Sequence, residues 1–325
     1  MISVCFKNQV IRLNYWSSLP IDGARPYILI FHALTGNSNA NEWWDIQKLY
    51  RKYCCICFTI PSSPYHEQET DFSISEECEI IFSALQKLKI HSLKSVLGGS
   101  LGGFYALEFA YKFPDFVQNC IAMATAIRAS DWLLCWNEIQ RQALLLPNGM
   151  ALARMIAMMS YRSPQAFDSF ENGICNNRVF SINDSKVDIS CREDIEPAEK
   201  CVVESEIILK TPNEKYLDEP HPVSFSSLSY LHYQAYKFNA RFKQAEYLKL
   251  LANMDRYRLN GEILIPTLSI AFSTDILFPP HHVQQIQKSC SHSKSKHFDV
   301  LTEFGHDGFL VEPTKFIDEI IRFLK

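Results

Sequence analysis

The segment Ser95-Val96-Leu97-Gly98-Gly99-Ser100-Leu101-Gly102-Gly103 decides the fold prediction for this chain. Its apolar start predicts a short strand, and the residues from 102 to 113 have the spacing of a helix that Pro114 ends. A G-x-S-x-G pattern between a strand and a helix is typical of a sharp turn that exposes a serine at the carboxyl edge of a sheet. Ser100 is therefore a candidate nucleophile. The alternative is a glycine-rich phosphate-binding turn, for which no GK[ST] or GxGxxG pattern is present.

Strands and helices alternate on both sides of this segment. Apolar runs at 27–31, 53–60 and 120–124 predict strands, and Ser73 with Glu76 predicts a capped helix that reaches about residue 90. After Gly261 the alternation returns, with strands at 263–272 (interrupted at Pro266) and 298–301 and helices at 281–287 and 314–324. Such alternation favours βαβ units and a parallel sheet.

The middle of the chain has a different pattern. Helical periodicity dominates at 132–144, 150–161 and 230–254, and a polar stretch at 171–204 predicts a long loop. We therefore expect one α/β core made of residues 1–125 and 261–325, with a mainly helical lid inserted at 126–260.

Composition excludes several other classes of protein. The chain has 325 residues, 47% of them hydrophobic and 21% charged, which is unlike a disordered chain or a coiled coil. A net charge of −4 gives no general attraction for nucleic acid or anionic membranes, so neither is an expected partner. No apolar run of about 18 residues predicts a membrane span.

The cysteines and the first residues predict a cytoplasmic protein. Lys7 and Arg12 interrupt the start of the chain too early for the apolar part of an export signal. The 11 cysteines are scattered, which favours reduced thiols over a disulfide framework. Cys54-Cys55-Ile56-Cys57 contains CxxC without a second pair, so we expect buried strand cysteines and no metal site.

A serine hydroxyl needs a base to become nucleophilic, and the later strands offer one. Asp275 and His306 each follow a predicted strand, in the chain order serine, acid, histidine. Asp275 would orient His306 and stabilise its imidazolium form, although a loop cap is the alternative for this aspartate. The backbone N–H groups of Leu34, in the loop after the first core strand, and of Leu101 are the candidates for an oxyanion hole.

Several motifs, taken together and in order from about residue 27 onward, resemble homoserine O-acetyltransferases. They are His32-Ala33-Leu34-Thr35-Gly36, the segment around Ser100, Ala153-Arg154-Met155-Ile156 with Tyr161-Arg162-Ser163, Lys237-Phe238 with Arg241-Phe242, Asp275-Ile276-Leu277-Phe278-Pro279-Pro280 and Gly305-His306-Asp307-Gly308-Phe309-Leu310.

The resemblance implies an α/β-hydrolase fold, with a mostly parallel central sheet flanked by helices and a helical lid. It implies an O-acyltransferase that works through an acyl-serine, with acetyl-CoA or succinyl-CoA as co-substrate and no bound cofactor. The implied acceptor is an amino-acid hydroxyl, that of L-homoserine first, which would place the protein in methionine biosynthesis. By the same resemblance Arg154 binds the acceptor carboxylate, Asp307 binds its amino group, and the protein is a homodimer.

The chain also departs from that family. Pro61-Ser62-Ser63-Pro64-Tyr65 stands where the family has a glycine-rich loop, and Lys243 and Ala245 replace its usual Asp and Asn. These changes lie near the expected acceptor pocket, so the acceptor and the acyl group stay open. A serine esterase or thioesterase with the same three residues is the alternative function, and a binding protein without activity is a third.

Overall fold

The computed structural model describes residues 1–66, 68, 71–169 and 226–325. Its strands are β1 (Ile2–Phe6), β2 (Gln9–Leu13), β3 (Tyr15–Ser17), β4 (Tyr27–Phe31), β5 (Cys54–Phe58), β6 (Ser95–Gly99), β7 (Cys120–Met123), β8 (Thr267–Phe272) and β9 (Lys296–Val300). Its α-helices are α1 (Gln47–Tyr50), α2 (Ile74–Lys87), α3 (Leu101–Lys112), α4 (Asp131–Leu144), α5 (Gly149–Tyr161), α6 (Pro164–Asp168), α7 (Ser226–Asn239), α8 (Gln244–Arg256), α9 (Pro280–Gln284), α10 (Gly308–Val311) and α11 (Ile317–Phe323).

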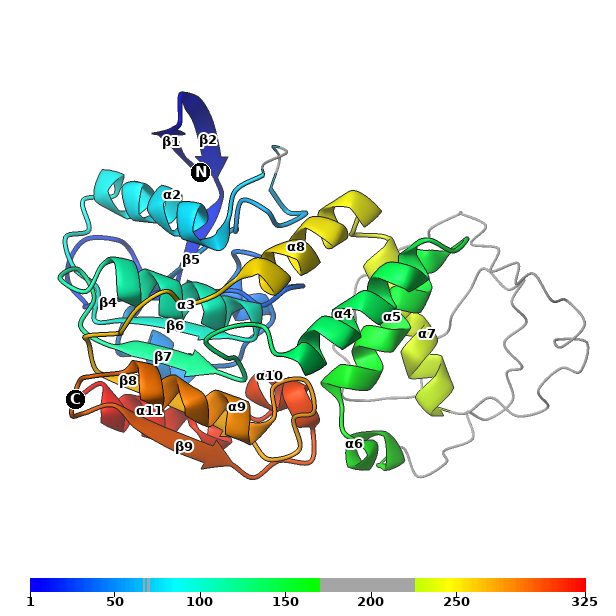
Figure 1. The fold of residues 1–325 in the computed structure, drawn as a ribbon. Helices are drawn as coiled ribbons and strands as arrows, with labels where there is room; N and C mark the ends of the chain where they lie inside the picture. Colours follow the sequence, from blue (N-terminus) through cyan, green and yellow to red (C-terminus); the bar gives the residue numbers. More distant parts are fainter. Residues whose placement is uncertain (67, 69–70, 170–225) are drawn as a thin grey trace, which may run out of the picture.

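Seven strands form the central sheet, in the order β3-β5-β4-β6-β7-β8-β9 (Figure 1). Only β3, at one edge, is antiparallel to its neighbour, and the other neighbouring pairs are parallel. The predicted mostly parallel sheet is therefore confirmed. Because parallel strands end at the same edge, the loops after β4, β6, β8 and β9 meet there. A separate hairpin of β1 and β2 precedes the sheet.

Two apolar layers cover the sheet, one on each face. Leu29 and Phe31 of β4 pack in the cluster that includes α2 and α3, while Ile28 and Ile30 pack in the cluster that includes α1 and α11. This alternation is the two-residue period of a strand buried on both faces. The cysteines of β5 follow it and are all buried, which confirms their prediction as strand cysteines.

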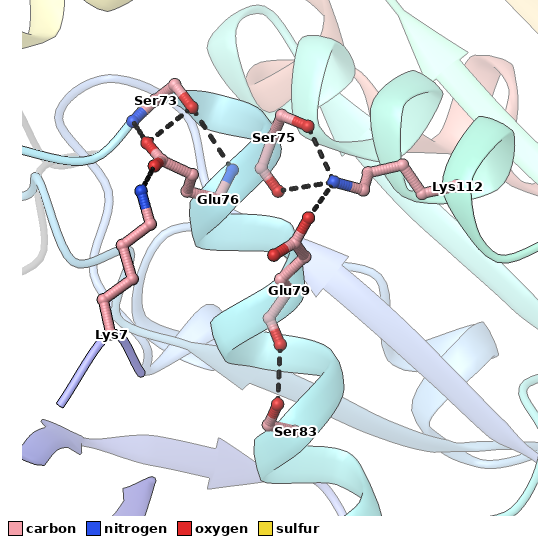
Figure 2. A network of polar contacts seen from close by, with 7 residues as sticks. All are labelled: Lys7, Ser73, Ser75, Glu76, Glu79, Ser83 and Lys112. Carbon is pink, nitrogen blue, oxygen red and sulfur yellow. Dashed lines mark hydrogen bonds and ion pairs between the residues drawn. The ribbon is translucent and has the colours of Figure 1, made fainter. Parts of the chain in front are cut away.

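Helix α2 begins at the capping box that the sequence predicted. The Ser73 and Glu76 side chains bond each other's backbone N–H groups, as Figure 2 shows. Lys7 of the turn between β1 and β2 forms an ion pair with Glu76, which joins the N-terminal hairpin to α2. Lys112 of α3 bonds Ser75 and pairs with Glu79. These contacts fix α2 against α3, the helix that begins beside Ser100.

Helices α4 to α8 lie between β7 and β8 in the chain and gather beyond one end of the sheet (Figure 1). Asp255 of α8 accepts a 2.7 Å hydrogen bond from Asn137 of α4 and pairs with Arg141. The predicted helix at 230–254 is two helices, because the chain turns after Asn239 and buries Phe242 against Phe238, with 4.3 Å between ring centroids. The polar stretch at 171–204 lies outside the described residues.

Within the described ranges, no helix is both long enough and apolar enough to cross a membrane.

Candidate active site

Ser100 occupies a sharp turn between β6 and α3. Its backbone has φ 57° and ψ −126°, a region that residues with side chains rarely adopt. Close approach of the surrounding backbone requires glycine at two neighbouring positions. A Cβ on Gly98 would lie 2.0 Å from the carbonyl oxygen of Gly102, and one on Gly102 would lie 2.2 Å from that of Phe31. The turn holds Ser100 at the carboxyl edge of the sheet, where only 6% of its surface is exposed.

Asp275 and His306 lie side by side, from the loops after β8 and β9. His306 Nδ1 and Asp275 Oδ2 are 2.8 Å apart, and both side chains are almost completely buried. Asp275 Oδ1 accepts hydrogen bonds from the backbone N–H groups of Leu277 and Phe278, at 2.8 and 2.9 Å. These two bonds aim the other carboxylate oxygen at the histidine. A carboxylate on Nδ1 leaves Nε2 as the ring nitrogen that can take a proton.

Aromatic rings surround His306, and one of them also contacts the residue before Ser100. The ring of Phe278 stacks on the imidazole at 5.4 Å, and that of Phe309 meets it edge-on at 5.5 Å. A Cβ on Gly99, the residue before Ser100, would lie 2.6 Å from the same Phe309 ring. Phe309 thus packs against both parts of the site. Among the described residues no hydrogen bond joins Ser100 to His306, and such bonds are often long in enzymes without substrate.

The loop from His32 to Gly36 lies against the start of α3. Gly102 is in close contact with the backbone of Phe31 and His32, which brings this loop beside Leu101. Leu101 begins α3, so no residue of the helix can accept its N–H. Leu34 is 95% buried, and in the described part of the chain no backbone carbonyl accepts its N–H. The two predicted oxyanion-hole donors therefore lie in adjacent segments.

His32 holds that loop in place as a neutral residue. Its Nδ1 lies 2.8 Å from the carbonyl oxygen of Ala33, and its Nε2 accepts a 3.0 Å hydrogen bond from the Ile60 N–H. The roles of both nitrogens are fixed by these partners, because a carbonyl can only accept and an N–H only donates. Burial lowers the pKa of His32 to about 4. His32 therefore joins the loop after β4 to the segment after β5.

Arg154 of α5 has two buried guanidinium nitrogens with unused donors. Its Nε and Nη1 atoms are buried and have no hydrogen-bond partner among the described residues. The guanidinium lies 5.5 Å from the ring centroid of Tyr161 and 5.2 Å from that of Phe238. The Tyr161 ring is in turn 5.7 Å from the His306 ring. A cation with two buried N–H groups that lack a partner, next to a tyrosine that contacts the histidine, is a suitable site for an anion.

Asp307, which follows His306, is paired with Arg162 at the end of α5. Arg162 Nε lies 3.5 Å from Asp307 Oδ2, and both side chains are mostly buried. Burial raises the pKa of Asp307, while Arg162, His306 and Arg154 act to lower it. The structure thus brings Arg154, Asp307 and His306 close enough to interact electrostatically. Sequence reasoning gave no role to Arg162, because an ion pair across 145 residues leaves no local pattern.

The site combines a buried serine on a strained strand-to-helix turn with an aspartate-bound histidine at the same sheet edge. This arrangement is typical of proteins with the α/β-hydrolase fold. The chain matches the model of the α/β hydrolase fold family over residues 26–313, and it belongs to that family.

Within this family the predicted resemblance to homoserine O-acetyltransferases is confirmed. The chain is 27% identical to the homoserine O-acetyltransferase of Chloroherpeton thalassium over 346 residues, which cover 91% of this chain and 79% of that protein. The crystal structure of the Staphylococcus aureus homoserine O-acetyltransferase has the same fold, with a TM-score of 0.72, 22% identity and coverage of 100% and 93% of the two chains. Esterase E22 has it as well, with a TM-score of 0.75, 16% identity and coverage of 100% and 98%.

Proposed function

We propose that this protein is an acyl-CoA-dependent O-acyltransferase that transfers an acyl group to the hydroxyl of a small amino acid. L-homoserine is the first candidate for this acceptor. Its similarity to homoserine O-acetyltransferases supports the reaction. The observation that supports the acceptor is Arg154, whose buried Nε and Nη1 have no hydrogen-bond partner among the described residues. A carboxylate would accept both N–H groups at once, in the two-pronged geometry that a guanidinium favours.

In the first half-reaction, Ser100 Oγ attacks the thioester carbonyl of acetyl-CoA or succinyl-CoA, and His306 Nε2 takes the hydroxyl proton. The N–H groups of Leu34 and Leu101 bind the oxyanion that forms. The carbon–sulfur bond breaks, and the sulfur of CoA receives the proton from His306. Asp275 stabilises the imidazolium during this exchange. The products are free CoA and an acyl ester on Ser100.

In the second half-reaction, the acceptor hydroxyl attacks the acyl ester while His306 takes its proton. Arg154 holds the acceptor carboxylate, and Asp307 holds its ammonium group. The bond between the acyl carbon and Ser100 Oγ breaks, and His306 returns a proton to the serine. The buried setting of His306 and the aromatic rings around it limit access of water, which a transferase must exclude from its acyl-enzyme.

The same site could serve a serine esterase or thioesterase, in which water replaces the acceptor. Free CoA should be followed after mixing the protein with acetyl-CoA, alone and with L-homoserine, L-serine or L-threonine. We expect release beyond the first turnover to depend on one of these acceptors. Equal steady release without any acceptor would instead identify a thioesterase.

We also propose that the protein is a homodimer in the cytoplasm. Apolar side chains at the surface of α4, α5 and α7 are available for a second copy: Trp132, Ile139, Leu152, Met159 and Leu228. The eight cysteines in the described ranges are free thiols, which supports a reducing compartment.

A further inference from the structure

Arg162 lies where the end of α5 meets the loop that carries the candidate base. A Cβ on Gly305, the residue before His306, would lie 3.0 Å or less from backbone atoms of Tyr161, Arg162 and Ser163. Ser163 Oγ donates a hydrogen bond to the carbonyl oxygen of Glu303 in the same loop. The two segments are therefore packed backbone to backbone, which fixes the Cα of Arg162 relative to Asp307.

The guanidinium of Arg162 contacts two side chains. It lies 4.4 Å from the ring centroid of Tyr230 of α7, a distance at which the ring attracts the cation. Its Nε also lies 3.5 Å from Asp307 Oδ2. Arg162 is only 13% exposed and Asp307 16%, so this pair is weakly screened by water.

The two oxygens of Asp307 differ in their surroundings. Oδ2 faces Arg162, whereas no donor within the described ranges forms a hydrogen bond to Oδ1. A carboxylate has about four acceptor positions, so Asp307 keeps capacity for a further cationic donor. Arg154, with its own free N–H groups, lies close enough to influence Asp307. A ligand with a carboxylate and an ammonium group on one carbon would match both residues.

We propose that Arg162 is a positioning residue for acceptor recognition: it holds Oδ2 of Asp307 and so directs Oδ1 toward the ammonium group of an amino-acid acceptor. This inference rests on the proposed function, because it takes the acceptor to be an amino acid bound between Arg154 and Asp307. Arg162 would thus contribute to acceptor recognition through Asp307, without contacting the acceptor itself.

The test compares two ligands that differ only in the amino group, L-homoserine and 4-hydroxybutanoate. Binding of each is measured by calorimetric titration to full-length protein carrying Ser100→Ala, so that no acyl transfer is needed. Adding Arg162→Met should weaken L-homoserine by about tenfold, the scale of one charge-assisted hydrogen bond, and change 4-hydroxybutanoate by less than about twofold. Arg162→Lys should recover part of the loss, and Arg322→Met, at an exposed arginine of α11, should change neither ligand.

Two further measurements separate positioning from a general effect on the lid. With Asp307→Asn already present, Arg162→Met should cause little additional loss of L-homoserine affinity, because the two residues act as one unit.

The second measurement is the pH dependence of L-homoserine binding. The groups that act on Asp307 are Arg162, His306, Arg154 and the Tyr161 hydroxyl. Removing Arg162 raises the pKa of Asp307, and a protonated Asp307 no longer attracts the ammonium group. As the solution is acidified, Arg162→Met should therefore lose affinity for L-homoserine at a higher pH than the protein that keeps Arg162.

Equal weakening of both ligands by Arg162→Met would overturn the inference and make Arg162 a structural link between α5 and α7. Unchanged binding of both ligands would overturn it as well. The proposed function can fail separately from this inference. The Ser100→Ala protein would then bind L-homoserine with the expected dependence on Arg162, while the parent protein transfers no acyl group to it. In that case the acyltransferase proposal is wrong and the role of Arg162 in binding stands.

Discussion

Glu76 and Glu77 are adjacent carboxyl groups on α2 with opposite surroundings. Glu76 is paired with Lys7, which lowers its pKa to about 2. Glu77 is fully buried, where it accepts hydrogen bonds from Tyr105 of α3 and from Ser62 after β5. Burial raises the pKa of Glu77 to about 8, so this group is mostly protonated in the folded protein at neutral pH. A neutral Glu77 joins the segment after β5 to the helix that begins beside Ser100.

Glu77 should make the protein less stable as pH rises. Below about pH 4.5 the group is protonated in both the folded and the unfolded chain, so it adds no pH dependence to the free energy of unfolding. Between pH 4.5 and 8 the unfolded chain releases the proton and the folded protein keeps it, so the free energy of unfolding falls with rising pH, by a few kcal/mol in total. Glu77→Gln, which resembles the protonated form, should remove this slope in denaturant unfolding measured from pH 5 to 8.5.

Glu76→Gln is the matched control for that measurement. Its lowered pKa means that Glu76 stabilises the fold above about pH 4.5 and loses this effect as pH falls toward 2. The substitution should therefore lower stability at neutral pH and leave the slope between pH 5 and 8.5 unchanged. If Glu77→Gln keeps the wild-type slope, Glu77 is ionised in the folded protein.

At the scale of elements, the approach of β4 to α3 positions the site. The Cβ of an alanine at 102 would meet only backbone atoms, at 2.2 Å from the Phe31 oxygen and 3.0 Å from the His32 oxygen. Side-chain rotation cannot relieve such a contact, so one backbone must shift. The shift would disturb the placement of the Leu34 loop relative to Leu101, the residue after Ser100.

Gly102→Ala should therefore lose both stability and serine reactivity. We expect a lower Tm and a rate of Ser100 labelling by a fluorophosphonate that falls by at least about tenfold, because misplacement of reacting groups by 1 Å can cost 10²-fold. Ala110→Gly, at a buried position of the same helix, should lower stability by about 1 to 2 kcal/mol through helix propensity and loss of a buried methyl group, and keep the labelling rate. Wild-type labelling in a folded Gly102→Ala protein would contradict the proposed oxyanion-hole geometry.

Some elements could be predicted from local sequence, and others depend on distant contacts. The strand at 27–31 and the capped start of α2 were predicted at their observed positions, because continuous apolar runs and capping boxes are local signals. The hairpin of β1 and β2 was missed, although Ile2, Val4 and Phe6 alternate with exposed residues as in a strand with one buried face, because each run is only five residues long. The break between α7 and α8 was missed because burial of Phe242 is a tertiary effect.

Part of the candidate site could likewise be predicted from local sequence, and the rest depends on distant contacts. The sequence predicted Ser100, Asp275 and His306 as site residues from their positions after strands, and the structure brings the last two into contact. The pairing of Asp307 with Arg162 and the neutral role of Glu77 depend on residues far apart in the chain. No sequence pattern reports such contacts.

For the whole molecule, the exposed apolar side chains of α4 and α5 have a consequence for assembly. Ile139 of α4 is 50% exposed and Leu152 of α5 is 40% exposed. If this surface joins two copies, the protein should sediment as a dimer, and Ile139→Lys with Leu152→Lys should give a monomer that still reacts with a fluorophosphonate at Ser100. A monomeric wild-type protein at micromolar concentration would refute the dimer.

Arg154 should act only in the second half-reaction of the proposed acyl transfer. The measurement is rapid-mixing release of CoA from acetyl-CoA, followed by transfer to L-homoserine, for wild type and Arg154→Ala. We expect the first-turnover release of CoA to stay nearly unchanged, while kcat/KM for L-homoserine falls by about 10²-fold or more through loss of a desolvated charged hydrogen bond. Transfer to 3-aminopropan-1-ol, which lacks the carboxylate, should barely change. Slower first-turnover release, or equal losses for both acceptors, would show that Arg154 does not act by binding the acceptor carboxylate.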